Sequence, residues 1–221
     1  MSVIIPGRFN LVNSKFVEVD KDTLSKHINK DDDLNKYHIF DISGNFITSI
    51  ASPSITTYFH KLTELHLINN ELPNIPEEIN NIITLKKLYL SKNNIQQITN
   101  IDKLVDLELL DLRANQIKEM SNLENNTKIN NLSLSSNQII SLNNLNINME
   151  HLESLFLFSN KLENLQETLD ILSKHCPKLT KLLLTANPCT SLSRPKEEQQ
   201  VYENNVKKAL PNIRILDWKP L

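Results

Sequence analysis

The sequence of 221 residues predicts an α/β solenoid, in which short repeats stack with a parallel β-sheet on the concave face. Three observations predict this class: a leucine and asparagine pattern recurs seven times, its period is short, and the last 31 residues have the features of a cap. Hydrophobic residues make up 39% of the chain and charged residues 23%, which is enough for one well-buried core.

The repeat is clearest at Leu62, Leu65, Leu67, Asn70 and Leu72, with the spacing Leu-x-x-Leu-x-Leu-x-x-Asn-x-Leu. We number its positions from the first leucine, so that the asparagine is position 9. Five further copies follow, and a degenerate copy over 37–47 precedes them. Position 9 is occupied by Asn45, Asn70, Asn93, Asn115, Asn137, Asn160 and Asn187, in steps of 25, 23, 22, 22, 23 and 27 residues. This is the pattern of a leucine-rich repeat, and we assign seven repeats to residues 37–190.

Strand geometry predicts the role of each position. Alternate residues of a strand face opposite sides, so positions 4 and 6 should point into the core and positions 3, 5 and 7 to the concave surface. The asparagine at position 9 should end the strand in a turn, where its amide can bond to backbone groups that the turn leaves unpaired. We therefore expect the asparagines to be structural.

The segments that return on the convex face carry apolar residues at every third position, as at Ile95, Ile98, Ile101, Leu104 and Leu107. A period of three favours short 3₁₀ or irregular structure over a long α-helix. The longest repeat differs, because its apolar residues have helical spacing over 163–174 and Pro177 follows. Cys176 and Cys189 should be apolar fillers.

The C-terminal cap is assigned to residues 191–221. Pro195 marks a helix start, and an apolar stripe follows at Tyr202, Val206, Ala209 and Leu210. The repeat phase then predicts Ile213 and Ile215 as the inward pair of a last strand. It places Trp218 at position 9, where we expect the ring to close the stack.

The N-terminal cap is assigned to residues 1–36. Weak alternation over 3–19 is compatible with a hairpin, with Pro6-Gly7 or Asn13-Ser14 as its turn, and residues 22–30 with a short helix capped by Asp20 or Asp22. The acidic triplet at 31–33 lacks the ligand pattern of a calcium loop, so we expect a solvated loop and no metal. The first residues do not have the pattern of a secretory signal.

The repeats resemble those of intracellular leucine-rich-repeat proteins, above all the class with about 22 residues per repeat that includes the nuclear regulatory subunit of protein phosphatase one. The ending, with Asn187-Pro188-Cys189, Tyr202, Val206 and the run from Leu210 to Trp218, is similar to the C-terminal cap of that class and of spliceosomal A-prime type proteins. This resemblance covers residues 37–221 and implies non-enzymatic binding of a protein through the concave sheet. Residues 1–36 resemble no family that we can name.

Candidate binding residues follow from the outward positions. Neighbouring strands lie about 4.8 Å apart, so Phe156, Phe158 and Leu183 should form one apolar patch, and Ile68 and Tyr89 a smaller one. A partner could cover these residues, or the N-terminal segment of the chain or a slight twist of the stack could hide them. The remaining candidates, which would tune the choice of partner, are Glu64, His66, Lys87, Leu109, Asp111 and Arg113.

Other functions are less well supported by the sequence. His66, Tyr89 and Asp111 share position 5 in consecutive repeats and could form a proton relay, but no phosphate loop, nucleophile motif or metal-ligand spacing accompanies them. We therefore expect no enzyme, no cofactor and no small-molecule substrate.

Composition bears on the remaining partners. The net charge of −2 predicts no direct binding of nucleic acid or membrane. Membership of a ribonucleoprotein, cytoskeletal or axonemal complex through a protein partner stays open. Two cysteines cannot form the disulfide clusters of secreted repeat proteins, which favours an intracellular location, cytoplasmic or nuclear.

Overall fold

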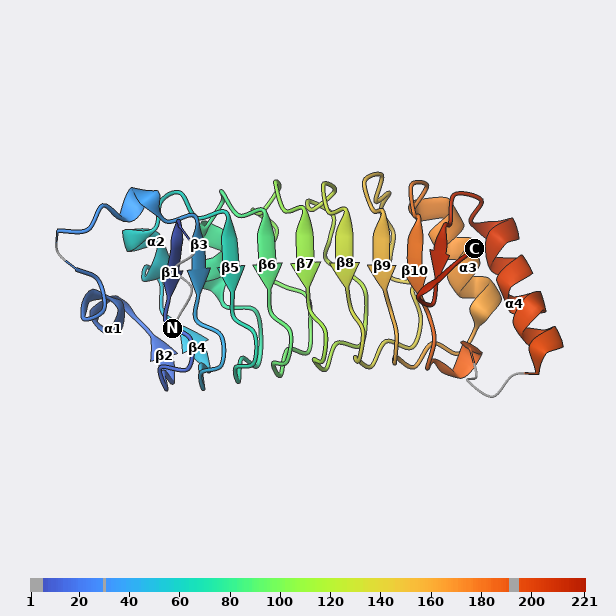
Figure 1. Cartoon of the computed structure of the whole chain (residues 1–221), viewed down its shortest axis with the longest axis horizontal. Coiled ribbons are helices and arrows are strands. Elements are labelled where there is room, and N and C mark those ends of the chain that lie inside the picture. Colours follow the sequence, from blue (N-terminus) through green and yellow to red (C-terminus); the bar gives the residue numbers. More distant parts are fainter. Residues whose placement is uncertain (1–5, 30, 191–194) are drawn as a thin grey trace.

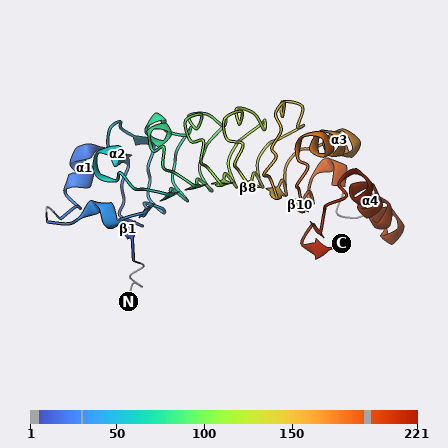
Figure 2. The same ribbon diagram turned by 90° about the horizontal axis from the view of Figure 1, so that it is seen from above.

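The computed structural model describes residues 6–29, 31–190 and 195–221 and shows a stack of repeats (Figure 1) that is curved when seen from above (Figure 2). One ten-stranded sheet, in the order β1-β3-β5-β6-β7-β8-β9-β10-β11-β12, runs along it, and all pairs are parallel except β11 with β12. Seen from above, the strands line one side and the return segments the other (Figure 2). The predicted fold class, a leucine-rich-repeat solenoid, is confirmed.

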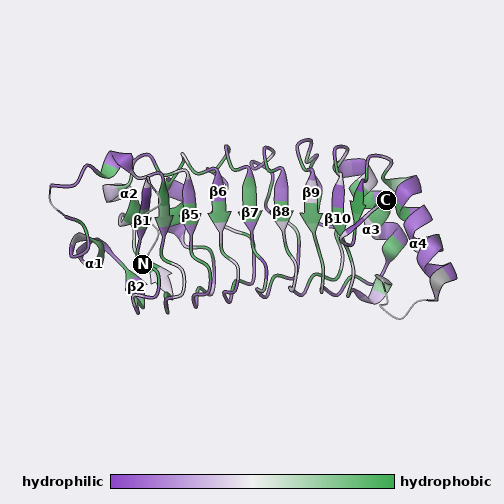
Figure 3. Cartoon of the chain, viewed as in Figure 1, coloured by the Kyte–Doolittle hydropathy of each residue, from purple (hydrophilic) through white to green (hydrophobic). Residues whose placement is uncertain are grey.

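All seven predicted repeat strands are present, each three residues long: β3 (Ile39–Asp41), β5 (Glu64–His66), β6 (Lys87–Tyr89), β7 (Leu109–Asp111), β8 (Asn131–Ser133), β9 (Ser154–Phe156) and β10 (Lys181–Leu183). They pair in the register that the repeat phase predicts, so Leu88, Leu110 and Leu132 are direct neighbours. Position 4 is fully buried in every repeat. Most strands therefore carry both hydrophobic and hydrophilic residues (Figure 3), as a sheet with one face in the core requires.

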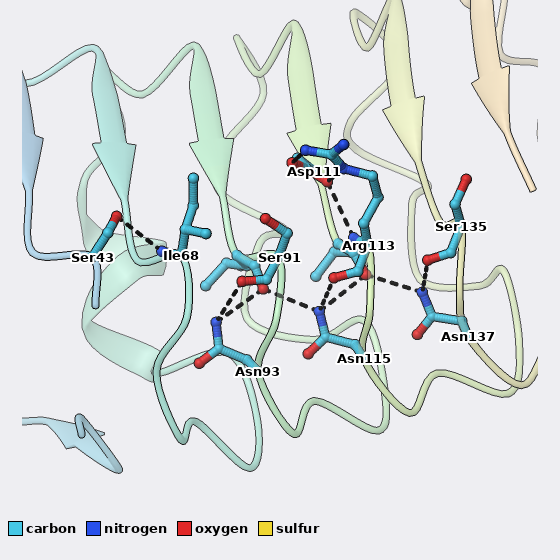
Figure 4. A network of polar contacts seen from close by, with 11 residues as sticks. Ser43, Ile68, Ser91, Asn93, Asp111, Arg113, Asn115, Ser135 and Asn137 are labelled. Carbon is cyan, nitrogen blue, oxygen red and sulfur yellow. Dashed lines mark hydrogen bonds and ion pairs between the residues drawn. The ribbon is translucent and has the colours of Figure 1, made fainter. Parts of the chain in front are cut away.

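The asparagines of position 9 form a ladder below the strands (Figure 4). The amide of Asn115 donates to the carbonyls of Leu90 and Leu112, both at 3.0 Å, and its oxygen accepts from the backbone N–H of Ile95 at 3.0 Å. Each rung thus ties its own strand to the preceding repeat. The predicted structural role of the asparagines is confirmed.

The residue before each ladder asparagine has a positive φ. Glycine fills this place only at Gly44 (φ 68°), and Ala114 (φ 53°) and Ala186 (φ 60°) adopt the same conformation with a side chain. The other members are Asn69, Lys92, Ser136 and Ser159. A side chain in the left-handed region costs about 1 kcal/mol. The solenoid therefore carries a small repeated strain that burial and the ladder outweigh.

The convex face is irregular, as the period of three predicts, with short helices α2 (Ile55–Tyr58), η2 (Glu77–Asn81) and η3 (Pro188–Thr190). The predicted long helix is α3 (Leu165–His175), with Asn164 as its N-cap. Cys176 is buried, and loss of hydration raises the pKa of its thiol to about 12. Cys189 packs half-buried against the core.

The N-terminal hairpin is a wrong prediction over the residues described. β1 (Arg8–Asn10) pairs in parallel with β3, and β2 (Glu18–Val19) pairs in parallel with β4 (Ser49–Ile50), so this segment is one more coil of the solenoid. The coil extends the ladder, because the Asn45 oxygen accepts from the backbone N–H groups of Ser14 and Phe16. Residues 3–5 of that prediction lie outside the described residues.

The rest of the N-terminal cap agrees better with expectation. Helix α1 (Lys21–Ser25) is capped by Asp20, one of the two predicted caps, but it ends before the end of the predicted range 22–30, of which residue 30 lies outside the described residues. In the acidic triplet, Asp33 caps η1 (Leu34–Lys36), and Asp32 accepts hydrogen bonds from Lys36 and Tyr37. Two of the three carboxylates, those of Asp32 and Asp33, therefore have hydrogen-bond partners within the chain.

The C-terminal helix α4 (Lys196–Ala209) buries Tyr202, Val206 and Leu210 as predicted, but the phase of the last strand is wrong. In β11 (Ile215–Leu216), Leu216 pairs with Leu182 at position 4, so Leu216 points inward and Ile215 does not. Trp218 consequently does not take the place of an asparagine. It stands in the turn before β12 (Lys219–Pro220), and its contact with Phe156 places it on the concave side.

Candidate protein-binding groove

The fifth positions of the repeats form a continuous row across the concave face. The sheet register brings His66, Tyr89, Asp111, Ser133 and Phe156 side by side on consecutive strands. Leu183 follows Phe156 on β10. The sequence therefore placed these side chains on the correct face and in the correct order.

The predicted apolar patch is real, but its members differ in accessibility. Phe158 is exposed at 38% and Phe156 is half-buried, whereas Leu183 is only 2% exposed. The C-terminal turn lies over this part of the sheet, and the ring of Trp218 stacks on Phe156 with a centroid distance of 6.1 Å. Leu183 is thus covered by the chain itself, which corrects its prediction as an exposed contact residue.

Trp218 is the main functional candidate that sequence reasoning missed. It is 73% exposed, and both Asp217 (φ 51°) and Trp218 (φ 67°) have the positive φ of a tight two-residue hairpin turn. The Asp217 carboxylate fixes this turn by accepting from the N–H groups of Leu184 (2.7 Å) and Thr185 (2.9 Å). Its second oxygen accepts from the Tyr202 hydroxyl at 2.8 Å. The available signal was an aspartate, a turn-forming residue, directly before the aromatic residue.

The aromatic residues form one wall of a hollow of about 430 Å³ in the concave face. The hollow exists because Ser133 at the end of β8 and Ser135 just after it are small, while larger side chains, Tyr89 and Arg113 on one side and Phe158 and Trp218 on the other, flank them. The full lining is Tyr89, Leu109, Asp111, Arg113, Asn131, Ser133, Ser135, Ser136, Phe156, Phe158, Leu183 and Trp218. We call this hollow the groove.

The polar wall of the groove is an ion pair on β7 and the turn after it. Arg113 folds back over Asp111 (Figure 4), and its Nε and Nη2 donate to the two carboxylate oxygens at 2.9 and 2.8 Å. These bonds raise the pKa of the Arg113 guanidinium above its ordinary value. Asp111 is buried, whereas the arginine side chain remains 56% exposed. The pair therefore offers guanidinium donors to a ligand and no net charge.

The other predicted residues form a second polar cluster towards the N-terminal end. His66 Nε2 lies 2.6 Å from Glu64 Oε1, and Lys87 Nζ lies 3.3 Å from the other oxygen of Glu64. Burial favours a higher pKa for Glu64, but the bonds to His66 and Lys87 hold that pKa below its ordinary value. The rings of Tyr89 and His66 are stacked with their centroids 4.4 Å apart, so Tyr89 connects this cluster to the groove. Ile68 is half-buried, and its N–H donates to the Ser43 hydroxyl.

The proton relay considered above finds no chain of hydrogen bonds among its three described residues. His66 and Tyr89 meet face to face, but His66 bonds to Glu64, and Asp111 accepts from Arg113. In the part of the chain that the structure describes, no three His, Cys, Asp or Glu side chains are grouped to hold a metal. No helix of that part is long and apolar enough to cross a membrane.

Comparison with known proteins supports the fold. No protein-family model matches the sequence, and no curated protein matches it. Among solved structures, the internalin inlF of Listeria monocytogenes has a TM-score of 0.63 at 23% identity over 85% of this chain and 49% of its own. Internalin C2 of the same organism has a TM-score of 0.61 at 26% identity over 82% of this chain and 71% of its own.

A leucine-rich-repeat protein of Leptospira interrogans has a TM-score of 0.55 at 24% identity, covering 82% of this chain and 49% of its own. The chain spans about half the length of the inlF and Leptospira chains. These likenesses support the leucine-rich-repeat fold described above. By its repeats, its sheet and its structural neighbours, the chain is a leucine-rich-repeat solenoid.

Proposed function

We propose that this protein is an adaptor or regulatory subunit without enzymatic activity, and that it binds a protein ligand on its concave face. The observation that carries the proposal is the exposure of Phe158 and Trp218 at one wall of the groove. Exposed aromatic side chains in a concave surface are typical anchors of protein interfaces. Only 5% of the residues are aromatic, so their presence together at this site is informative.

The charged residues of the concave face support selection of a partner by pattern. Arg8 pairs with Asp41, Glu64 with His66 and Lys87, and Asp111 with Arg113. A ligand whose charges complement these groups along the sheet is favoured, chiefly through faster association, and one whose charges oppose them is rejected.

We also propose that the protein works inside a cell. The support is the use of cysteine: Cys176 and Cys189 form no disulfide, and the described caps consist of packed helices, a parallel coil and backbone hydrogen bonds. A reducing compartment is compatible with this construction. Fractionation of cells expressing the tagged protein tests the location directly.

The binding surface is tested by a pair of matched substitutions. Phe158→Glu places a charge in the groove, whereas Phe46→Glu places one at an exposed phenylalanine (52%) outside it. Tagged wild type and both variants are purified from the cells of origin, and each co-purifying protein is then produced and titrated calorimetrically. We expect a partner whose affinity falls about tenfold or more with Phe158→Glu and stays unchanged with Phe46→Glu. Equal affinities for wild type and a folded Phe158→Glu variant would remove the groove as the binding surface.

A further inference from the structure

We propose that the groove receives one tyrosine side chain of the partner protein, with the ring beside Phe158 and Trp218 and the hydroxyl beside Arg113 and Asn131. This inference rests on the proposed function, because it specifies what the partner presents to the concave face. It is argued from the shape of the hollow, from its unused polar groups and from its charge.

The apolar part of the groove lining includes flat aromatic faces. Trp218 and Phe156 are nearly parallel, at 23°, and Phe158 and Leu109 also line the hollow. The volume of about 430 Å³ admits one aromatic side chain together with part of its backbone, whereas a whole helix, about 10–12 Å across, exceeds it. Aromatic rings favour offset or edge-on contact with such walls.

The opposite side of the groove has polar groups to spare. Arg113 uses Nε and Nη2 on Asp111, while its Nη1 makes no hydrogen bond to the described residues. The half-buried side chain of Asn131 likewise makes none to them. A phenol oxygen accepts from a guanidinium, and a phenol O–H donates to an amide oxygen. A phenylalanine ring would cover these groups without bonding to them, which is unfavourable.

The charge of the groove argues against a charged occupant. Its lining contains one acid, Asp111, and one base, Arg113, and these neutralise each other. An arginine, lysine, carboxylate or phosphate buried here would bring a charge without a counterpart. The same reasoning disfavours RNA, whose backbone carries a charge at each phosphate, as does the net charge of −2. Tyrosine is aromatic, neutral and polar at its tip.

The aromatic wall is in place before any ligand binds. Asp217 and Trp218 both have the left-handed φ that a large side chain rarely adopts, and the three hydrogen bonds to Asp217 maintain it. The turn that carries Trp218 is therefore held, and the stack on Phe156 keeps its ring at the groove, so binding orders less of the chain than it would with a mobile turn.

The test uses amino-acid amides as probes and the full chain as receptor. Trp218 is the one tryptophan of the sequence, so its fluorescence reports on the groove directly. N-acetyl-tyrosinamide, N-acetyl-phenylalaninamide and N-acetyl-argininamide are titrated with excitation where only tryptophan absorbs, and poly(U) is titrated as the RNA arm. We expect saturable binding of the tyrosine amide, binding of the phenylalanine amide weaker by about fivefold, and the weakest response to the arginine amide and poly(U).

Variants of the protein distinguish the contribution of the tyrosine hydroxyl to the affinity from that of its ring. Arg113→Met keeps the aliphatic stem, and Asn131→Ala removes the amide group. Each variant should narrow the difference in affinity between the tyrosine and phenylalanine amides. Circular dichroism checks that both variants are folded. Lys181→Met, on the concave face outside the groove lining, is the control and should leave the difference unchanged. Phe158→Glu should weaken binding of both amides.

Two kinds of result overturn the tyrosine assignment. One is equal or stronger binding of the phenylalanine amide, the arginine amide or poly(U); the other is the absence of saturable binding by the tyrosine amide. Neither result changes the partner titration with Phe158→Glu and Phe46→Glu, which alone decides the proposed function.

Discussion

The rings of Phe156 and Trp218 are stacked at 6.1 Å, although one belongs to strand β9 and the other to the turn after β11. Trp218 is mostly exposed, so the contact buries little area and contributes modestly to the core. The contact nevertheless fixes one wall of the groove. We therefore interpret Trp218 as part of the proposed binding surface rather than as a plug for the end of the stack.

This interpretation predicts the stability of two variants at residue 218. Trp218→Ala loses an aromatic pair and should lower the free energy of unfolding by about 1 kcal/mol. Trp218→Gly loses the same pair but relieves the positive φ, so its free energy of unfolding should be within about 1 kcal/mol of wild type. Urea unfolding followed by circular dichroism measures both. A loss of several kcal/mol would show instead that the ring closes the core.

The asparagine ladder predicts a much larger effect at a buried position. Asn115→Ala leaves the carbonyls of Leu90 and Leu112 and the N–H of Ile95 without their side-chain partner. At 1–3 kcal/mol for a buried unpaired group, we expect the free energy of unfolding to fall by about 3 kcal/mol or more. Exposed Asn94, which precedes Ile95, provides the control. Asn94→Ala should change the free energy of unfolding by less than about 1 kcal/mol. Similar losses at both sites would contradict the role of the ladder.

The left-handed residue before each asparagine predicts opposite effects of two substitutions. At Ala114, with φ 53°, glycine removes the steric cost of the side chain but loosens the unfolded chain. We expect Ala114→Gly to change the melting temperature little, upwards if at all, and Ala114→Val to lower it clearly. Differential scanning calorimetry compares them. A glycine variant that melts well below the valine variant would refute this account.

The cluster around Glu64 predicts a pH dependence of stability. Its folded pKa lies below the ordinary value of 4.5, so its contribution is fully present above that value. The contribution is lost as the pH falls from 4.5 through the lower folded pKa. Glu64→Gln should therefore destabilise the protein at neutral pH, and the difference from wild type should shrink in acid. Thermal unfolding across this range measures it, with exposed Glu150→Gln as the control. A difference that grows in acid would reverse the assigned sign.

The strands and the candidate site could be predicted to very different extents. The spacing of leucine and asparagine sufficed for seven strands and their register, because each repeat packs on neighbours that obey the same rule. It also placed Phe156, Phe158, Asp111 and Arg113 on the concave face. The spacing could not reveal that Leu183 is covered, since the cover comes from a turn 34 residues later in the chain.

The sequence by itself determined the local period, and with it the direction in which each strand residue points, because strand alternation and repeat stacking are short-range rules. Only the tertiary structure decided the two ends. There β1 pairs in parallel with β3 without the repeat motif, and Leu216 rather than Ile215 pairs with Leu182, which carries Trp218 over the groove. These choices depend on packing against one neighbour instead of two, a constraint that no local pattern records.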